Sequence, residues 1–218
     1  MANVVTSEAV RIDVGSVAME GDLHVPERVE GLVIFAHGSG SSRFSRRNRA
    51  VAKVLEHSRF ATLLLDLLTA DEEAADVRTA QYRFDIPLLG QRVIDAADWV
   101  RTRSDISSLP LAFFGASTGA AAALIAAAAR PEATRAVISR GGRPDLADDA
   151  LSQVQAPTLL IVAGADEPVI AMNRDAMRRM RAPVHLEIVP GASHLFAEPG
   201  ALDQVAALAA EWCRRHLK

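Results

Sequence analysis

The sequence is poor in cysteine, contains no apolar run of membrane-spanning length and carries little excess charge. Its single cysteine, Cys213, excludes an internal disulfide and a zinc site built from cysteines, and it suits a reducing compartment. The alanine-rich tract 120–129 comes nearest to a membrane span, but it is too short and Arg130-Pro131 closes it. A net charge of −3 gives no reason to expect nucleic acid or an acidic membrane surface as a partner.

Three further absences narrow the class of protein. Residues 1–8 lack a basic segment followed by an apolar one, so we expect no secretion signal and a cytoplasmic location. The six histidines form neither H-x-H nor H-x-x-x-H, and we expect no metal and no organic cofactor. There is no internal repeat and no linker, which predicts a single domain over residues 1–218.

The chain does contain a regular alternation of apolar strands and amphipathic helices. Strands at 9–14 and 17–25, joined at Gly15-Ser16, predict an antiparallel hairpin at a sheet edge. Later strands are short and mostly apolar on both faces, as in a parallel sheet covered by helices, and are expected at residues 32–36, 60–66, 111–114, 136–139, 158–163 and 184–189. Helices are expected at residues 49–59, 86–103, 120–129, 146–152, 170–180 and 201–217. This order predicts an α/β fold with a mainly parallel sheet of about seven to eight strands and helices on both faces.

The rest of the chain is organised around the pentapeptide Gly115-Ala116-Ser117-Thr118-Gly119. It follows an apolar strand and opens the alanine-rich helix, which is the context of a G-x-S-x-G nucleophile elbow. The glycines have a steric reason, because backbone passes too close to them to admit a Cβ. Ser117 is therefore the candidate nucleophile.

A serine hydroxyl needs a general base, and the base needs a carboxylate to orient it. Ligands of an open parallel sheet bind beyond the C-terminal ends of its strands. His194 follows the last predicted strand, and Asp166 follows the one before it. Asp145 is the alternative third member, whereas Asp66 at another strand end is interpreted as structural.

The chain order Ser117, Asp166, His194 resembles that of the α/β-hydrolase superfamily, and most closely its small, cap-less dienelactone hydrolase-like members. The resemblance covers essentially the whole chain and implies the α/β-hydrolase fold without a cap domain. It also implies an oxyanion hole formed by the backbone N–H groups of Ser39 and Thr118, with His37 supporting the loop. The dienelactone hydrolases themselves carry a cysteine at the elbow, so Ser117 shifts the expectation towards a serine esterase.

Several arginines stand close in sequence to these strand ends. Arg43, Arg46, Arg47 and Arg49 surround the start of a predicted helix, where cations oppose the helix dipole. The plain interpretation is a solvated basic face. The alternative is that an arginine of this run, such as Arg43, or else Arg140 or Arg143, binds a carboxylate or phosphate of the substrate.

The sequence thus predicts a serine carboxylic-ester hydrolase that acts on accessible small esters through an acyl-enzyme. Only residues 140–152 stand where this fold usually inserts a cap, so an open site is expected. The same triad could instead serve a peptidase, an acyltransferase or a perhydrolase. A ligand-binding protein without turnover is the alternative outside the enzymes.

Overall fold

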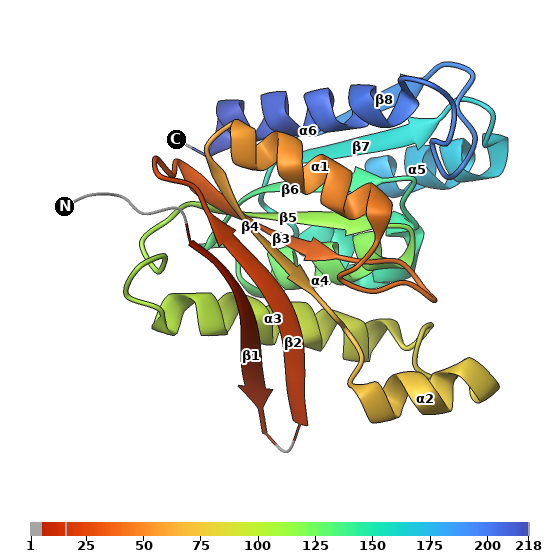
Figure 1. The fold of residues 1–218 in the computed structure, drawn as a ribbon. Helices are drawn as coiled ribbons and strands as arrows, with labels where there is room; N and C mark the ends of the chain where they lie inside the picture. The colour runs from red at the N-terminus through yellow and green to blue at the C-terminus, as the bar shows by residue number, and fades with distance from the viewer. Residues whose placement is uncertain (1–5, 16, 218) are drawn as a thin grey trace.

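The computed structural model describes residues 6–15 and 17–217. Residues 1–5, on which the secretion prediction partly rests, and Ser16 of the predicted turn lie outside the described residues. An eight-stranded sheet forms the centre of the molecule (Figure 1). Its strands are β1 (Thr6–Val14), β2 (Val17–Val25), β3 (Gly31–Ala36), β4 (Phe60–Leu65), β5 (Leu111–Ala116), β6 (Thr134–Arg140), β7 (Thr158–Ala163) and β8 (Val184–Val189).

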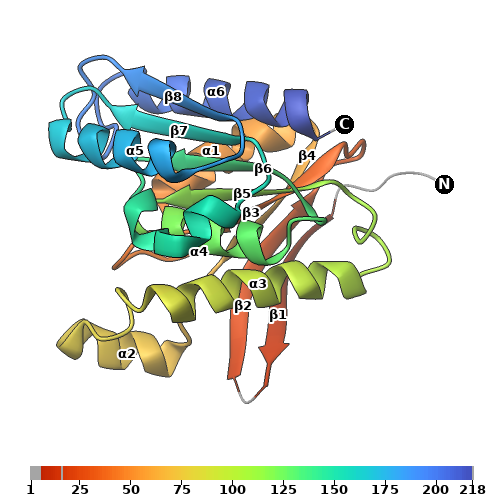
Figure 2. The same ribbon diagram turned by 180° about the vertical axis from the view of Figure 1, so that it is seen from behind.

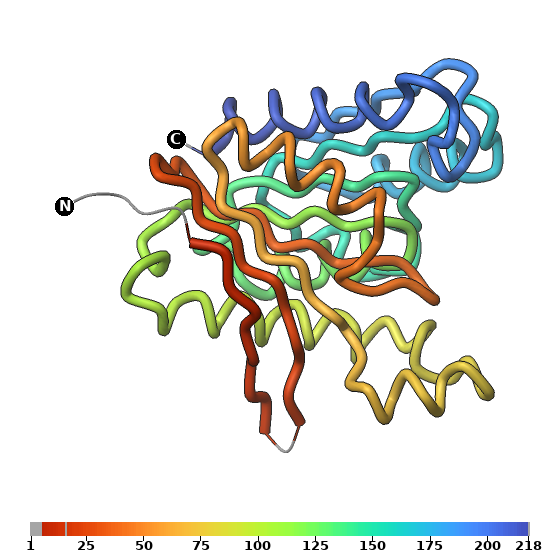
Figure 3. The backbone as a smooth tube through the Cα atoms, in the orientation of Figure 1, coloured from red at the N-terminus to blue at the C-terminus, as the bar shows by residue number. Residues whose placement is uncertain are grey.

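The strand order is β1-β2-β4-β3-β5-β6-β7-β8, and every pairing from β4 to β8 is parallel. β2 pairs antiparallel with both β1 and β4, so the predicted hairpin at the sheet edge is confirmed. The tube in Figure 3 shows this hairpin lying along β4, although more than 30 residues separate the two in the chain. The parallel strands all end at the same edge of the sheet, which brings their following loops together.

Helices cover both faces of the sheet, as the sequence predicts. They are α1 (Arg46–His57), α2 (Ala70–Thr79), α3 (Ile86–Thr102), α4 (Thr118–Ala129), α5 (Glu167–Arg179) and α6 (Ala201–His216), with the 3-10 segment η1 (Pro144–Gln153). α1 and α6 lie against each other over one face (Figure 1), whereas α3 and α4 cover the other (Figure 2). Alternate side chains of one strand serve the two cores: Phe113 packs towards α4, and Phe114 packs towards α1 and α6.

One element departs from the expectation, because the segment after β4 lacks apolar periodicity yet forms helix α2. Its side chains are almost entirely polar or exposed, so the signal of a buried stripe is missing. The helix begins with a capping box in which Thr69 and Glu72 satisfy each other's backbone N–H groups. Near the end of the same helix, the buried Asp76 carboxylate accepts hydrogen bonds from the backbone N–H groups of Tyr82 and Arg83.

Within the described ranges, no helix combines the length and the apolar character needed to cross a lipid bilayer. Between β6 and β7 the described chain contains only η1, so no cap domain covers the C-terminal edge of the sheet there.

Candidate active site

Ser117 lies at the turn between β5 and α4, with φ 51° and ψ −123°. This is an unfavourable backbone conformation for a residue with a side chain, and the surrounding structure must hold it. The two flanking glycines make the turn possible. A Cβ on Gly115 would lie 2.6 Å from the nitrogen of Ala120, and one on Gly119 would lie 2.5 Å from the carbonyl oxygen of His37. Strand, turn and helix therefore form the predicted elbow.

The imidazole of His194 lies against the carboxylate of Asp166, with 2.6 Å between Nδ1 and Oδ2. An ionised carboxylate only accepts hydrogen bonds, so Nδ1 donates the proton, and in a neutral imidazole the lone pair is then on Nε2. The loops that hold the pair are joined by backbone bonds: Gly164 N–H donates to Val189 O at 2.8 Å, and Ala165 N–H donates to Ala192 O at 2.9 Å. The pairing thus depends on the neighbouring ends of β7 and β8.

Asp145, the alternative third member, and Asp66, interpreted as structural, both bind arginines. Asp145 accepts from the Arg143 guanidinium at 2.7 and 2.9 Å. Asp66, at the end of β4, accepts both the backbone N–H and the guanidinium of Arg43. Neither carboxylate is bonded to His194 among the described residues.

The loop after β3 lies beside the elbow. A Cβ on Gly38 would come within 3.0 Å of the Ser117 Cβ, so glycine lets this loop pass close to the nucleophile. The backbone N–H of Ser39 donates to the Thr118 hydroxyl at 2.9 Å. Thr118 opens α4, and the first N–H groups of a helix have no acceptor within it.

His37 is buried and anchors that loop. Its Nε2 accepts the backbone N–H of Leu67 at 3.0 Å, which leaves the ring proton on Nδ1, 2.9 Å from the carbonyl of Gly38. Burial lowers the pKa of His37 below its ordinary value, since the charged ring would lose its hydration. A neutral ring with both nitrogens engaged matches the structural support expected from the sequence.

Ser117 and His194 line one cavity of about 210 Å³ beyond the ends of β5 and β6. Ser39, Arg47, Asn48 and Arg140 line it as well. Arg140 is the last residue of β6 and only 7% exposed. Burial, and secondly the charge of Arg47, lowers the pKa of Arg140 to about 10.

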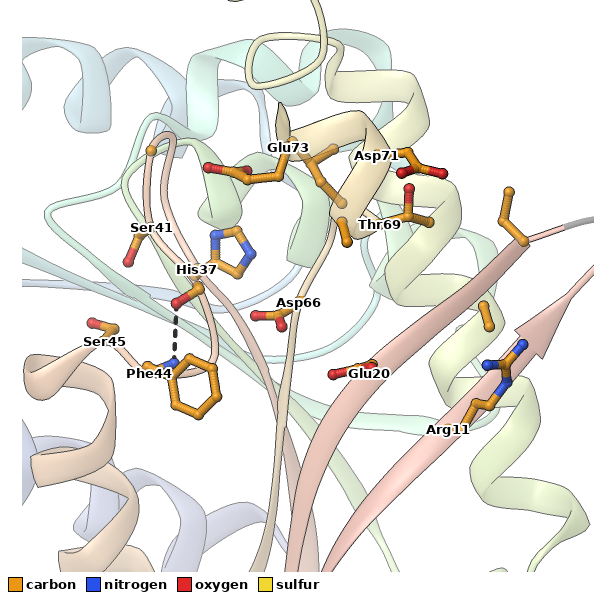
Figure 4. A pocket seen from close by; sticks show the side chains of 16 residues that line it. Arg11, Glu20, His37, Ser41, Phe44, Ser45, Asp66, Thr69, Asp71 and Glu73 are labelled. Carbon is orange, nitrogen blue, oxygen red and sulfur yellow. Dashed lines mark hydrogen bonds between the residues drawn. The ribbon is translucent and has the colours of Figure 1, made fainter. Parts of the chain in front are cut away.

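A larger cavity of about 820 Å³ is lined by the loop that follows β3, by residues of β1 and β2 and by the start of α2 (Figure 4). Glu20, Asp66, Asp71 and Glu73 give its wall acidic groups, and Phe44 stands at its edge. Thr69, Ala70, Asp71 and Glu73 belong to the start of α2 and its cap, so the segment after β4 forms part of the wall of this larger cavity.

Cys213 is buried in α6, and burial raises the pKa of its thiol to about 12. Such a thiol stays protonated and unreactive at neutral pH. Across residues 6–15 and 17–217 no group of three or more histidine, cysteine, aspartate or glutamate side chains could hold a metal ion.

The sheet order, the strained serine after β5 and the polar loops after β7 and β8 define the α/β-hydrolase fold. The family model described as the dienelactone hydrolase family matches residues 19–217. The chain therefore belongs to the dienelactone hydrolase family.

Solved structures share this fold. A crystal structure of a dienelactone hydrolase from Anabaena variabilis is 55% identical, with a TM-score of 0.96 over 98% of this chain and 99% of that one. Est1E from Butyrivibrio proteoclasticus shares the fold at 17% identity, with a TM-score of 0.79 over 95% of this chain and 98% of that one.

Two relatives from Mycobacterium tuberculosis, strains CDC 1551 and H37Rv, are each 54% identical over 210 residues. Their names suggest a phosphoribosyl transferase. The match covers 96% of this chain but only 46% of each relative, so more than half of those proteins has no counterpart here.

Proposed function

We propose that the chain is a serine carboxylesterase in which Ser117, His194 and Asp166 act as the catalytic triad. The observation that carries the proposal is a strained serine and a carboxylate-bound histidine on the wall of one cavity. The pairing with Asp166 leaves Nε2 as the basic nitrogen of His194, as a general base requires.

In the proposed reaction His194 Nε2 takes the hydroxyl proton as Ser117 Oγ attacks the ester carbonyl carbon. The positive imidazolium is stabilised by Asp166. The tetrahedral intermediate collapses when His194 returns the proton to the leaving alcohol, which gives an acyl-enzyme. Water then attacks the acyl group with His194 again as base, and the acid is released as Ser117 regains its proton.

The oxyanion is proposed to lie between the backbone N–H groups of Thr118 and Ser39. The Thr118 N–H stands at the start of α4, where the helix dipole also favours negative charge. The Ser39 N–H already donates a hydrogen bond to the Thr118 hydroxyl. We propose that, as charge develops, this N–H donates to the oxyanion instead, or donates to both acceptors at once. Two backbone donors held by β3 and by the elbow would need little rearrangement.

The substrate is proposed to be a small ester with an accessible carbonyl. The cavity beside Ser117 is about 210 Å³, and in the described chain η1 is the only element between β6 and β7, which leaves the site open to solvent. A long lipid chain would find no covered apolar channel along this polar wall.

Labelling by a fluorophosphonate probe tests the nucleophile. Wild type should be labelled at Ser117 and should hydrolyse p-nitrophenyl acetate with multiple turnovers, whereas Ser117→Ala should do neither. Continued labelling of Ser117→Ala would disprove the assignment. A single turnover without release would favour the ligand-binding alternative, and faster cleavage of peptide amides than of esters would favour a peptidase.

A further inference from the structure

The guanidinium of Arg140 is buried beside the proposed nucleophile without a carboxylate to balance it. Only 7% of Arg140 is exposed, and its Nε has no hydrogen-bond partner in the described part of the chain. Within residues 6–15 and 17–217, its only side-chain hydrogen bond is a long one of 3.4 Å from Nη2 to Asn48 Oδ1. The ring of Phe196 lies 6.0 Å away and supplies weak further support. An isolated buried cation is unfavourable, and proteins rarely keep one without a partner.

Three other arginines considered from the sequence are different, because each has a carboxylate. Arg43 binds Asp66 and Glu20, Arg49 binds Asp22 at 2.8 Å, and Arg143 binds Asp145. Among the described residues neither Arg140 nor Arg47 forms such a pair. Of the arginines considered from the sequence, these two are the ones left with an unbalanced charge at the cavity.

Arg47 adds to the positive potential at Arg140. It also lines the cavity, its Nε is buried without a partner, and its charge lowers the pKa of Arg140. Arg47 lies in the first turn of α1, which contains no acidic residue. The N-terminus of the helix therefore contributes a further partial positive charge at the position where cations are least favourable.

Among the residues that the structure describes, no aspartate or glutamate lines this cavity. Its polar wall consists of two arginines, Asn48, His194 and serine side chains, namely Ser39, Ser41, Ser45 and Ser117. Hydroxyls, an amide and guanidinium groups around a helix N-terminus are the donors that bind carboxylates and phosphates in proteins. The wall thus has many hydrogen-bond donors and no anion of its own.

We propose that this cavity binds an anionic oxyacid group of the substrate through Arg140 and Arg47, so that the enzyme selects esters that carry a carboxylate or a phosphate. The inference rests on the proposed esterase function and names its substrate class. The backbone N–H of Ser117 donates to the carbonyl of Arg140 at 3.2 Å, which fixes the arginine to the elbow. Arg140 and Ser117 line the same cavity of about 210 Å³, so an anionic group bound there and the carbonyl attacked by Ser117 can belong to one small substrate.

The test compares kcat/KM for mono-p-nitrophenyl succinate with that for p-nitrophenyl acetate. Wild type should favour the anionic ester, and Arg140→Gln and Arg47→Gln should each lower the ratio of the two constants about tenfold or more, the effect of losing a charge-assisted hydrogen bond. Arg140→Lys keeps a charge and should retain part of the preference. The control Arg215→Gln removes an exposed arginine that binds Glu211 on α6, and it should leave the ratio unchanged. Thermal melting of each variant shows whether it is folded.

Binding to Ser117→Ala gives a second measurement that needs no turnover. Calorimetry with succinate and with inorganic phosphate should show binding that Arg140→Gln abolishes, and the tighter anion tells carboxylate from phosphate. The anion site would be overturned if the arginine variants lost kcat/KM equally on neutral and anionic esters and if neither anion bound to Ser117→Ala. Fluorophosphonate labelling of Ser117 would still support the esterase in that case. Conversely, anion binding that depends on Arg140 without labelling of Ser117 would support the anion site and refute the esterase.

Discussion

The backbone N–H of Ser39 donates to the hydroxyl of Thr118, across 79 positions of sequence. The bond joins the loop after β3 to the residue that follows Ser117 in the elbow. Both residues are proposed to supply the oxyanion hole, so the same contact positions its two halves. An oxyanion hole is effective when its donors are held in place before the reaction.

Thr118→Val should therefore lower kcat without preventing binding of the substrate. Valine has the same shape but no acceptor, so the Ser39 loop loses one restraint. We expect kcat on p-nitrophenyl acetate to fall about tenfold, less than the loss of an oxyanion donor itself, which costs about a hundredfold or more. Thr118→Ser keeps the hydroxyl and should stay near wild type. A full rate in Thr118→Val would show that the bond does not position the loop.

Asp166→Asn should reduce kcat about a thousandfold or more, because an amide can no longer fix the imidazole proton on Nδ1 or stabilise the imidazolium. Steady-state kinetics on the same ester gives the measurement. Asp145→Asn is the matched control: it breaks a partly exposed pair with Arg143 and should change kcat only slightly. The reverse result would make Asp145 the third member of the triad.

Gly119→Ala should destabilise the protein strongly. The new methyl group would meet backbone atoms of Ala36 and His37, which cannot move aside as a side chain can. We expect the free energy of unfolding in urea to fall by about 3 kcal/mol, the upper range for overpacking. Gly15→Ala measures the cost of a positive φ without crowding, because nothing lies within 4 Å of the Cβ position at Gly15. We expect it to lower the free energy of unfolding by about 1 kcal/mol. Equal costs would mean that crowding does not explain the glycine at position 119.

The elbow and the mainly parallel sheet were predictable because they follow local rules. Gly115, Ser117 and Gly119 report a backbone conformation directly, and apolar strands that alternate with helices specify a parallel sheet. The structure places Asp166 beside His194 because β7 and β8 are neighbours, which is the natural result of that alternation. Their catalytic roles remain proposals.

The carboxylate partners of the arginines and the presence of helix α2 could not be predicted from the sequence, for a different reason. Arg43 and Arg140 look alike as residues, and only the tertiary arrangement brings Glu20 and Asp66 to the first and none to the second. Helix α2 has no apolar stripe that would reveal it in the sequence. The capping box at Thr69 and the contacts of Asp76 stabilise it instead. A single sequence carries little signal for such polar contacts between distant positions.

The final prediction concerns the pH dependence of stability through His37. Burial lowers its pKa in the folded protein, whereas the unfolded chain keeps the ordinary value of about 6.5. Below that pH the unfolded state binds more protons, so the stability contributed by neutral His37 is present above about pH 6.5 and is lost as the pH falls. The slope from this group is at most about 1.4 kcal/mol per pH unit.

Urea unfolding of wild type and His37→Gln between about pH 7.5 and 5.5 measures the effect, since that window lies above the titration of ordinary carboxylates. Glutamine can still accept the N–H of Leu67 but does not titrate, so its stability should vary less with pH. His216 also has a lowered pKa, first through burial and then through Arg215 and His185, and His216→Gln measures that separate contribution. If His37→Gln lost stability as steeply as wild type over this window, the buried ring would not be the group that takes up the proton.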